Sequence, residues 1–134
     1  MSKIIKSALV SFAALSAIGF AAPAMAQDAE SGQDIFRQCR ACHQIGAGAK
    51  NLVGPQLNGI VGRKASTVEG FNYSPASNDA GAKGLVWTEE NLMKYLAGPA
   101  AFMPGNKMAY AGLKDENDRK DVIAYLKKAG GVAK

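Results

Sequence analysis

The stretch Cys39-Arg40-Ala41-Cys42-His43 contains both cysteines and the single histidine of this 134-residue chain. On a helix, side chains three positions apart lie on one side, so both thiols can reach the same edge of a bound group. The histidine that follows the second cysteine is then carried beneath that group, where its nitrogen can bind a metal. The C-x-x-C-H spacing is typical of c-type haem attachment. It predicts Cys39 and Cys42 as the attachment residues and His43 as the nitrogen ligand of the iron.

Three other interpretations of this pentapeptide compete with haem. A dithiol redox pair is expected in a βαβ context, and no such pattern is visible here. A structural zinc site lacks its fourth ligand in any usual pattern, because the chain offers only two cysteines and one histidine. A disulfide closing this short loop is compatible with an exported protein. The position of the motif near the start of a small helical domain favours haem.

Helical periodicity predicts an all-α domain, and no alternating strand pattern competes with it. A first helix places Gly32, Phe36 and Cys39 on one face. Thr88 and Asp115 are the expected N-caps of two later helices. The predicted helices cover residues 29–42, 88–97, about 99–103 and about 115–129.

The span between the first two predicted helices, residues 44–86, has eight Gly, two Pro and no convincing long helix. A compact domain does not tolerate a loop of this length unless something other than regular structure organises it. A buried prosthetic group would do so, because chain segments can wrap around it. The sequence therefore predicts one small domain of helices and long loops around a single, covalently bound haem.

Residues 1–26 have the pattern of a cleaved secretory signal peptide, which predicts a periplasmic domain over residues 27–134. Lys3 and Lys6 precede an apolar run, and Ala24-Met25-Ala26 is a small-x-small cleavage site. The alternative is an uncleaved anchor, but the apolar run is shorter than the roughly 20 residues of a membrane span. We therefore expect no stable membrane insertion.

The charge of the chain argues against nucleic acid as a partner. Removing Lys3 and Lys6 lowers the formal net charge from +5 to +3. No basic run is interleaved with aromatic residues, as a nucleic-acid surface would require. A face of lysines directed toward an acidic protein partner remains compatible with this composition.

Three methionines follow the cleavage site, and one of them is a candidate for the sixth ligand of the iron. Met93 lies within a predicted helix and is expected to fill the core. Met103 and Met108 flank Pro104-Gly105-Asn106-Lys107, a turn that can present a thioether opposite His43. Spacing alone does not decide which of these two methionines is the sixth ligand.

Over nearly all of residues 29–130 the chain resembles the class I c-type cytochromes, close to the bacterial cytochrome c2 group and to mitochondrial cytochrome c. The resemblance implies the fold of that family. In this family the methionine that closes the P-G-x-K-M segment is the axial ligand, which implies Met108 and leaves Met103 as a packing residue. The matching stretches are Gly32 to His43, Gly54 to Gly59 with Gly62-Arg63, Gly70-Phe71-Asn72-Tyr73, Trp87 to Leu96, Pro104 to Met108, and Ile123 to Lys128.

The same resemblance implies further residues that bind or orient the haem. The carbonyl of Pro55 is expected to accept a hydrogen bond from the haem histidine, and Tyr95 to donate one to the methionine sulfur. Residues that hold a buried haem propionate are Arg63, Tyr73 and Trp87.

One segment departs from the family pattern. Residues 74–84, between Tyr73 and Trp87, form a longer stretch than in the mitochondrial proteins. The buried polar residue that the family places near the haem is therefore either Ser77 or Asn78.

The resemblance implies a soluble one-electron carrier rather than an enzyme. Such proteins shuttle between a cytochrome bc complex and a terminal oxidase or photosynthetic reaction centre. We expect a monomer that docks on acidic surfaces of these partners, with Lys50, Lys107 and Lys114 as candidate docking residues. Two alternatives are a haem sensor or gas-binding protein whose sixth ligand is displaced, and an electron acceptor dedicated to one periplasmic dehydrogenase.

Overall fold

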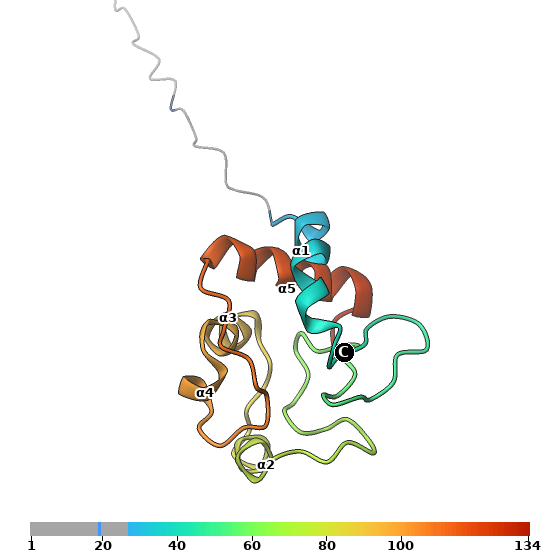
Figure 1. Ribbon diagram of the computed structural model, residues 1–134, viewed down its shortest axis with the longest axis vertical. Coiled ribbons are helices and arrows are strands. Elements are labelled where there is room, and N and C mark those ends of the chain that lie inside the picture. Colours follow the sequence, from blue (N-terminus) through green and yellow to red (C-terminus); the bar gives the residue numbers. More distant parts are fainter. Residues whose placement is uncertain (1–18, 20–26) are drawn as a thin grey trace, which may run out of the picture.

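The computed structural model describes Gly19 and residues 27–134 (Figure 1). Apart from Gly19, the predicted signal peptide lies outside the described residues. Within them, regular β-structure is limited to the isolated bridges Val61–Val132 and Lys64–Val86, so the all-α class is confirmed. The helical elements are α1 (Ala29–Phe36), the 3₁₀ turn η1 (Arg37–Cys39), α2 (Pro75–Ala82), α3 (Glu89–Ala97), α4 (Pro99–Phe102) and α5 (Glu116–Gly130).

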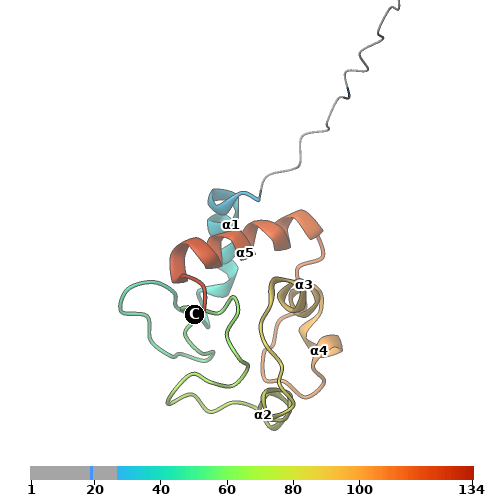
Figure 2. The same ribbon diagram turned by 180° about the vertical axis from the view of Figure 1, so that it is seen from behind.

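The first and last helices, α1 and α5, cross on one side of the molecule, as the views from front and back show (Figures 1 and 2). Their backbones touch at Gly32, where a Cβ atom would overlap the carbonyl oxygen of Asp121. Beside this contact, the rings of Phe36 and Tyr125 pack with their centroids 5.2 Å apart. This crossing fixes the direction in which α1 leads into the Cys39–His43 motif.

The first α-helix is shorter than the predicted span of residues 29–42 and does not include the cysteine motif. It ends at Phe36 and continues as the 3₁₀ turn η1, so Cys39 lies at the end of a tighter turn. The chain then bends back, and the amide of His43 donates to the carbonyl of Cys39 over 2.9 Å. His43 therefore lies outside α1, and its ring lines the interior cavity.

Helix α2 is the element that the sequence analysis did not predict. Its start carries ordinary signals, because the Ser74 side chain caps the amide of Ser77 and Pro75 occupies the first turn. Its composition of small and polar residues gives no apolar stripe, so periodicity does not reveal it. The predicted N-caps Thr88 and Asp115 are both confirmed as caps of α3 and α5.

Side-chain amides organise the long loops in place of regular backbone pairing. Asn58 accepts from the amide of Gly46 at 2.7 Å and donates to the carbonyl of the same residue at 2.8 Å. Asn51 accepts from the amide of Gln56 at 2.9 Å and donates to the carbonyl of Glu69 at 3.1 Å. These bonds satisfy backbone groups that no helix or strand would pair.

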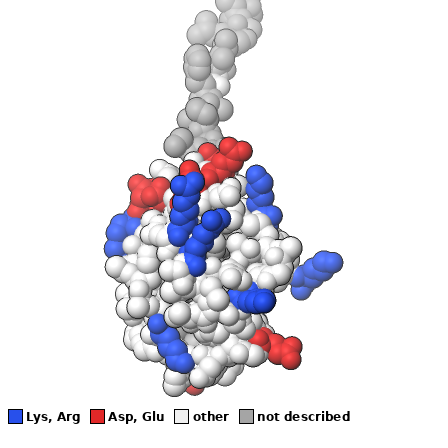
Figure 3. All heavy atoms as spheres, turned by 45° about the vertical axis from the view of Figure 1, so that its right-hand side comes forward, with Lys and Arg blue, Asp and Glu red and all other residues white. Residues whose placement is uncertain are grey.

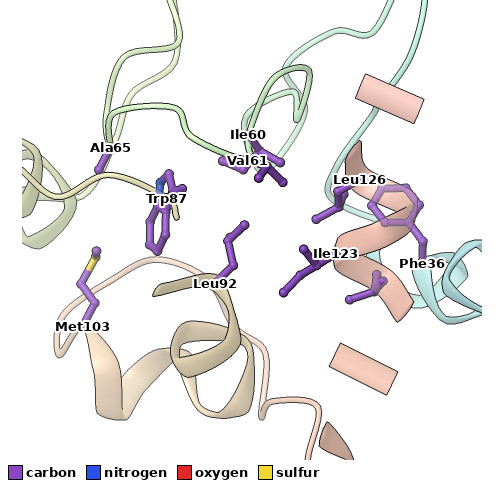
Figure 4. Packing of buried hydrophobic residues seen from close by; sticks show 10 residues of the cluster. Phe36, Ile60, Val61, Ala65, Trp87, Leu92, Met103, Ile123 and Leu126 are labelled. Atoms are coloured by element: carbon purple, nitrogen blue, oxygen red, sulfur yellow. The ribbon is translucent and has the colours of Figure 1, made fainter. Parts of the chain in front are cut away.

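The buried side chains surround a central space rather than filling it. Figure 4 shows Trp87, Leu92 and Leu126 lying around this space from three different segments. A cavity of about 280 Å³ opens there, lined by residues of α1, η1, α2, α3, α5 and the loops between them. The helices and loops therefore converge on a hollow core.

Candidate haem-binding site

The nine residues predicted to hold the haem and its iron all line this one cavity, although they come from distant parts of the chain. The cavity wall otherwise consists mainly of apolar side chains, among them Leu57, Ile60, Leu92 and Leu126. A site of this kind suits a large apolar group with a few polar attachments. The nine residues are Cys39, Cys42, His43, Pro55, Arg63, Tyr73, Trp87, Tyr95 and Met108.

The His43 ring is held in the orientation and tautomer of a metal ligand. Its Nδ1 lies 2.8 Å from the carbonyl oxygen of Pro55, and because a carbonyl only accepts, Nδ1 carries the proton. Burial lowers the pKa of His43, and the nearby Arg63 lowers it further against the opposing effect of the Pro55 bond. The neutral ring therefore keeps a lone pair on Nε2, as binding of iron requires.

The backbone beside this ring leaves room for it. A Cβ atom at Gly54 would overlap ring atoms of His43, so the residue before Pro55 must be glycine for the imidazole to keep this position. Gly54 and Pro55 therefore fix the position of the ring, because Gly54 leaves space for it and Pro55 accepts its hydrogen bond.

The two cysteines lie half-buried at the cavity wall and are not joined to each other by a disulfide. Burial raises the pKa of the Cys39 thiol to about 11, with a further contribution from Cys42. Redox-active dithiols use the opposite shift, since the thiolate is the nucleophile. The environment therefore disfavours the dithiol oxidoreductase interpretation.

Met108 faces the cavity next to a phenol that orients its sulfur. The Tyr95 hydroxyl donates to Sδ of Met108 over 3.3 Å, and burial raises the pKa of Tyr95 to about 12, which keeps that hydroxyl protonated. The Asn106 side chain accepts from the Met108 amide at 2.8 Å and donates to the carbonyls of Pro99 and Met103. The sulfur is thus held by its side chain and by the turn that carries it.

The other two methionines differ in their surroundings. Met103 also lines the cavity but is buried in the hydrophobic core, where it packs near Trp87. Met93 is a partly buried residue of α3 packed against the same core. The hydrogen bond from Tyr95 distinguishes Met108 from both.

One end of the cavity carries polar groups. Arg63 donates through Nη1 to the carbonyls of Gln56 and Asn58, at 3.2 and 2.8 Å, and burial lowers its pKa. Tyr73 and Trp87 line the cavity with it, and the Tyr73 hydroxyl accepts from the amide of Val68. A half-buried guanidinium beside an apolar space suits an acidic group of the bound molecule.

Of the two candidates for the buried polar residue near the haem, Ser77 and Asn78, the structure favours Ser77. Ser77 lines the cavity, and its hydroxyl is 2.8 Å from that of Ser66, whereas Asn78 is exposed. Helix α2 causes this difference because adjacent residues of a helix point in different directions.

Three further residues line the cavity that were not predicted as functional from the sequence: Gln38, Asn106 and Tyr110. Tyr110 donates from its hydroxyl to Oε1 of Gln38 over 3.0 Å. Tyr110 could have been proposed from the sequence, because it lies two residues after the candidate ligand Met108. No local pattern points to Gln38.

Comparison with known proteins agrees with this geometry. The family model for cytochrome c matches residues 29–130. Cytochrome c2 of Blastochloris viridis is 54% identical over 106 residues, which are 79% of this chain and 81% of that protein. Cytochrome c-550 of Ancylobacter novellus is 55% identical over 96 residues, 72% of this chain and 90% of that protein. The solved structure of cytochrome c2 from Rhodospirillum centenum superimposes with a TM-score of 0.73 at 44% identity, covering 77% of this chain and 98% of that one.

The fold and the site define a small all-α protein that wraps its chain around a covalently attached haem. The chain belongs to the cytochrome c family and, within it, to the class I cytochromes of the bacterial c2 type. It is an electron-carrier cytochrome with covalently attached haem c, and Cys39 and Cys42 fit the attachment motif. Among the described residues, no helix combines the length and the apolar character needed to cross a bilayer.

Proposed function

We propose that this chain is a soluble periplasmic one-electron carrier whose haem iron is bound by His43 and Met108. The observation that carries the proposal is the pairing of two oriented donors in one apolar cavity. Nε2 of a neutral His43 is left free by the Pro55 bond, and Sδ of Met108 is held by Tyr95. Cys39 and Cys42, at the same cavity wall, would form the thioether bonds.

The residues around the iron would favour electron transfer over binding chemistry. When bound, the haem supplies reversible one-electron exchange of its iron. With His43 and Met108 as its two ligands from the protein, the iron would have no position left for a substrate. Methionine opposite histidine raises the reduction potential, as is general for His/Met-ligated cytochromes c. The apolar wall excludes water, and Arg63, Tyr73 and Trp87 would hold the propionates at the polar end.

The proposed partners are proteins with acidic docking surfaces, such as a cytochrome bc complex and an oxidase or reaction centre. Lysine and arginine side chains are spread over the face in Figure 3, with acidic side chains toward its edges. Lys107, beside Met108, donates to the carbonyl of Asn72, and Lys114 donates to the carbonyls of Ala97 and Ala111. Both ammonium groups are thereby fixed in position, which favours steering of an acidic partner.

Substitution of the two cavity-lining methionines tests the ligand assignment. Met108→Ala should open the iron to carbon monoxide in the ferrous protein and lower the reduction potential strongly. Met103→Ala should leave both close to the wild-type values and cost about 2–5 kcal/mol of stability through lost packing. Carbon monoxide absorbance titrations and redox titrations of the two variants measure these effects.

Two outcomes would contradict the proposal. Rapid carbon monoxide binding by the wild-type ferrous protein would favour the sensor or gas-binding alternative. A Met103→Ala variant that opens the iron, with Met108→Ala unchanged, would assign the ligand to the other methionine.

A further inference from the structure

A hydrogen bond at the rim of the cavity joins the two sides of the haem-binding site. Tyr110 lies two residues after Met108, and Gln38 directly precedes Cys39 in η1. The Tyr110 hydroxyl donates to Oε1 of Gln38 over 3.0 Å, across a sequence separation of 72 residues. Both residues line the cavity while Gln38 is exposed and Tyr110 half-buried, so the bond lies where the cavity meets solvent.

The backbone couples this bond to Met108. The Tyr110 amide donates to the carbonyl of Met108 over 2.9 Å, so displacement of one residue displaces the other. The segment around them is fixed to α4 through Asn106 and to α3 through the 2.7 Å bond from the Leu113 amide to Leu96. Tyr110 adds an attachment to the opposite wall, which carries the cysteines.

We propose that the Tyr110–Gln38 bond bridges the cavity rim and slows the departure of the Met108 side chain, and with it the entry of external ligands. The inference rests on the proposed ligation by His43 and Met108. Tyr110 and Gln38 act here as positioning residues, because Met108 is the group that meets the iron. Opening this wall requires that the bond between Tyr110 and Gln38 be broken.

The size of the effect follows from the position of the bond. At the rim, water replaces a broken protein hydrogen bond, so its net contribution is that of an ordinary neutral bond. Its loss should therefore raise the affinity for a competing ligand by roughly three- to tenfold.

Imidazole binding to the ferric holoprotein tests this inference, followed by visible absorbance at equilibrium and by stopped flow. Tyr110→Phe removes the hydroxyl and keeps the ring, and Gln38→Ala removes the acceptor. Each should raise the imidazole affinity by the stated factor and accelerate the rate at saturating imidazole, which reports departure of Met108. The double variant should go no further than the single ones, because both remove the same bond.

Matched controls separate this role from a general loss of stability. Tyr125→Phe removes a hydroxyl from a ring packed on Phe36, and Gln33→Ala truncates an exposed glutamine of α1. Both should leave imidazole binding unchanged. If the Tyr110→Phe variant does not accumulate with haem bound, imidazole binding by the Gln38→Ala variant, changed at an exposed position, tests the inference.

The outcomes for the bridge and for the proposed function are distinct. Wild-type protein that binds imidazole as fast as Met108→Ala does would overturn the ligation by Met108. If Met108→Ala differs from wild type while Tyr110→Phe and Gln38→Ala behave like their controls, the bridge alone is overturned. Additive effects of the two substitutions would likewise show that the residues act separately.

Discussion

At the scale of single residues, the site depends on hydrogen bonds that orient each donor toward the cavity. Pro55 fixes the tautomer of His43, Asn106 fixes the turn before Met108, and Tyr95 binds the sulfur itself. Such outer contacts orient metal ligands and tune their basicity. Substituting these contacts would therefore test the proposed ligands without removing them.

Replacing Tyr95 by phenylalanine should lower the reduction potential. Its hydroxyl withdraws electron density from the Met108 sulfur, which weakens that sulfur as a donor and disfavours the ferric state. A change on the order of tens of millivolts is expected, since 59 mV corresponds to a tenfold change for one electron. Redox titration measures it, with Tyr125→Phe as control. An unchanged potential would mean that the bond does not influence the iron, and a higher one would contradict the predicted direction.

At the scale of the elements, the crossing of α1 and α5 positions the cysteine motif. Backbone contact at Gly32 brings the helices together, and the Asp28 amide donates to Asp121 Oδ1 at 2.8 Å beside it. The caps at Asp28 and Asp115 begin the two helices. Because α1 is short, its stability depends on both its N-cap and its contact with α5.

Gly32→Ala should destabilise the holoprotein by about 3 kcal/mol or more, because the new methyl group meets backbone atoms of α5 that cannot move aside as a side chain would. Denaturant unfolding measures the loss. The exposed neighbour Gln33, changed to alanine, should stay within about 0.5 kcal/mol of the wild-type protein. Equal effects of the two substitutions would show that the crossing tolerates a wider separation.

The N-cap of α1 should make part of the stability depend on pH. Hydrogen bonds from the Ser31 hydroxyl and from the amides of Glu30 and Ser31 lower the pKa of Asp28 below its ordinary value of 3.8. A lowered carboxyl pKa stabilises the fold above the unfolded-state value, and this contribution disappears as the pH falls through the folded-state value.

Asp28→Asn isolates that contribution, since the amide can still cap the helix but does not ionise. The wild-type protein should be the more stable at neutral pH, and the difference should vanish in acid below the lowered pKa. Unfolding midpoints across this range measure it, with Asp34→Asn on the same helix as control. A difference independent of pH would assign the effect of the substitution to packing.

At the scale of the whole molecule, patterns along the sequence predicted local features, and the family resemblance implied longer-range pairs such as His43 with Pro55 and Tyr95 with Met108. Cys39, Cys42 and His43 form one short motif, and the helices with apolar stripes and caps follow from periodicity. Helix α2 lacks such a stripe, and the Tyr110–Gln38 bond joins residues 72 positions apart. Placing Ser77 and Asn106 at the cavity also required the folded loops.

The hollow core predicts that the haem is needed for stable folding. The cavity is open to solvent at its rim, so without the haem its apolar walls would be exposed to water. The apolar walls, which come from α1, α3 and α5, therefore have too few partners among themselves to define one packed state.

We expect the haem-free chain to lack cooperative unfolding and fixed tertiary packing. Substituting both Cys39 and Cys42 by alanine prevents covalent attachment and shortens each of these half-buried side chains by its sulfur atom alone. Near-ultraviolet circular dichroism should lose its signal and urea unfolding should become gradual, whereas the holoprotein unfolds in one sharp transition. A haem-free variant with native helix content and a sharp transition would show that the α1–α5 crossing and the loop hydrogen bonds suffice. In that event the cavity would be a preformed site, and the haem would add binding energy to a fold already complete without it.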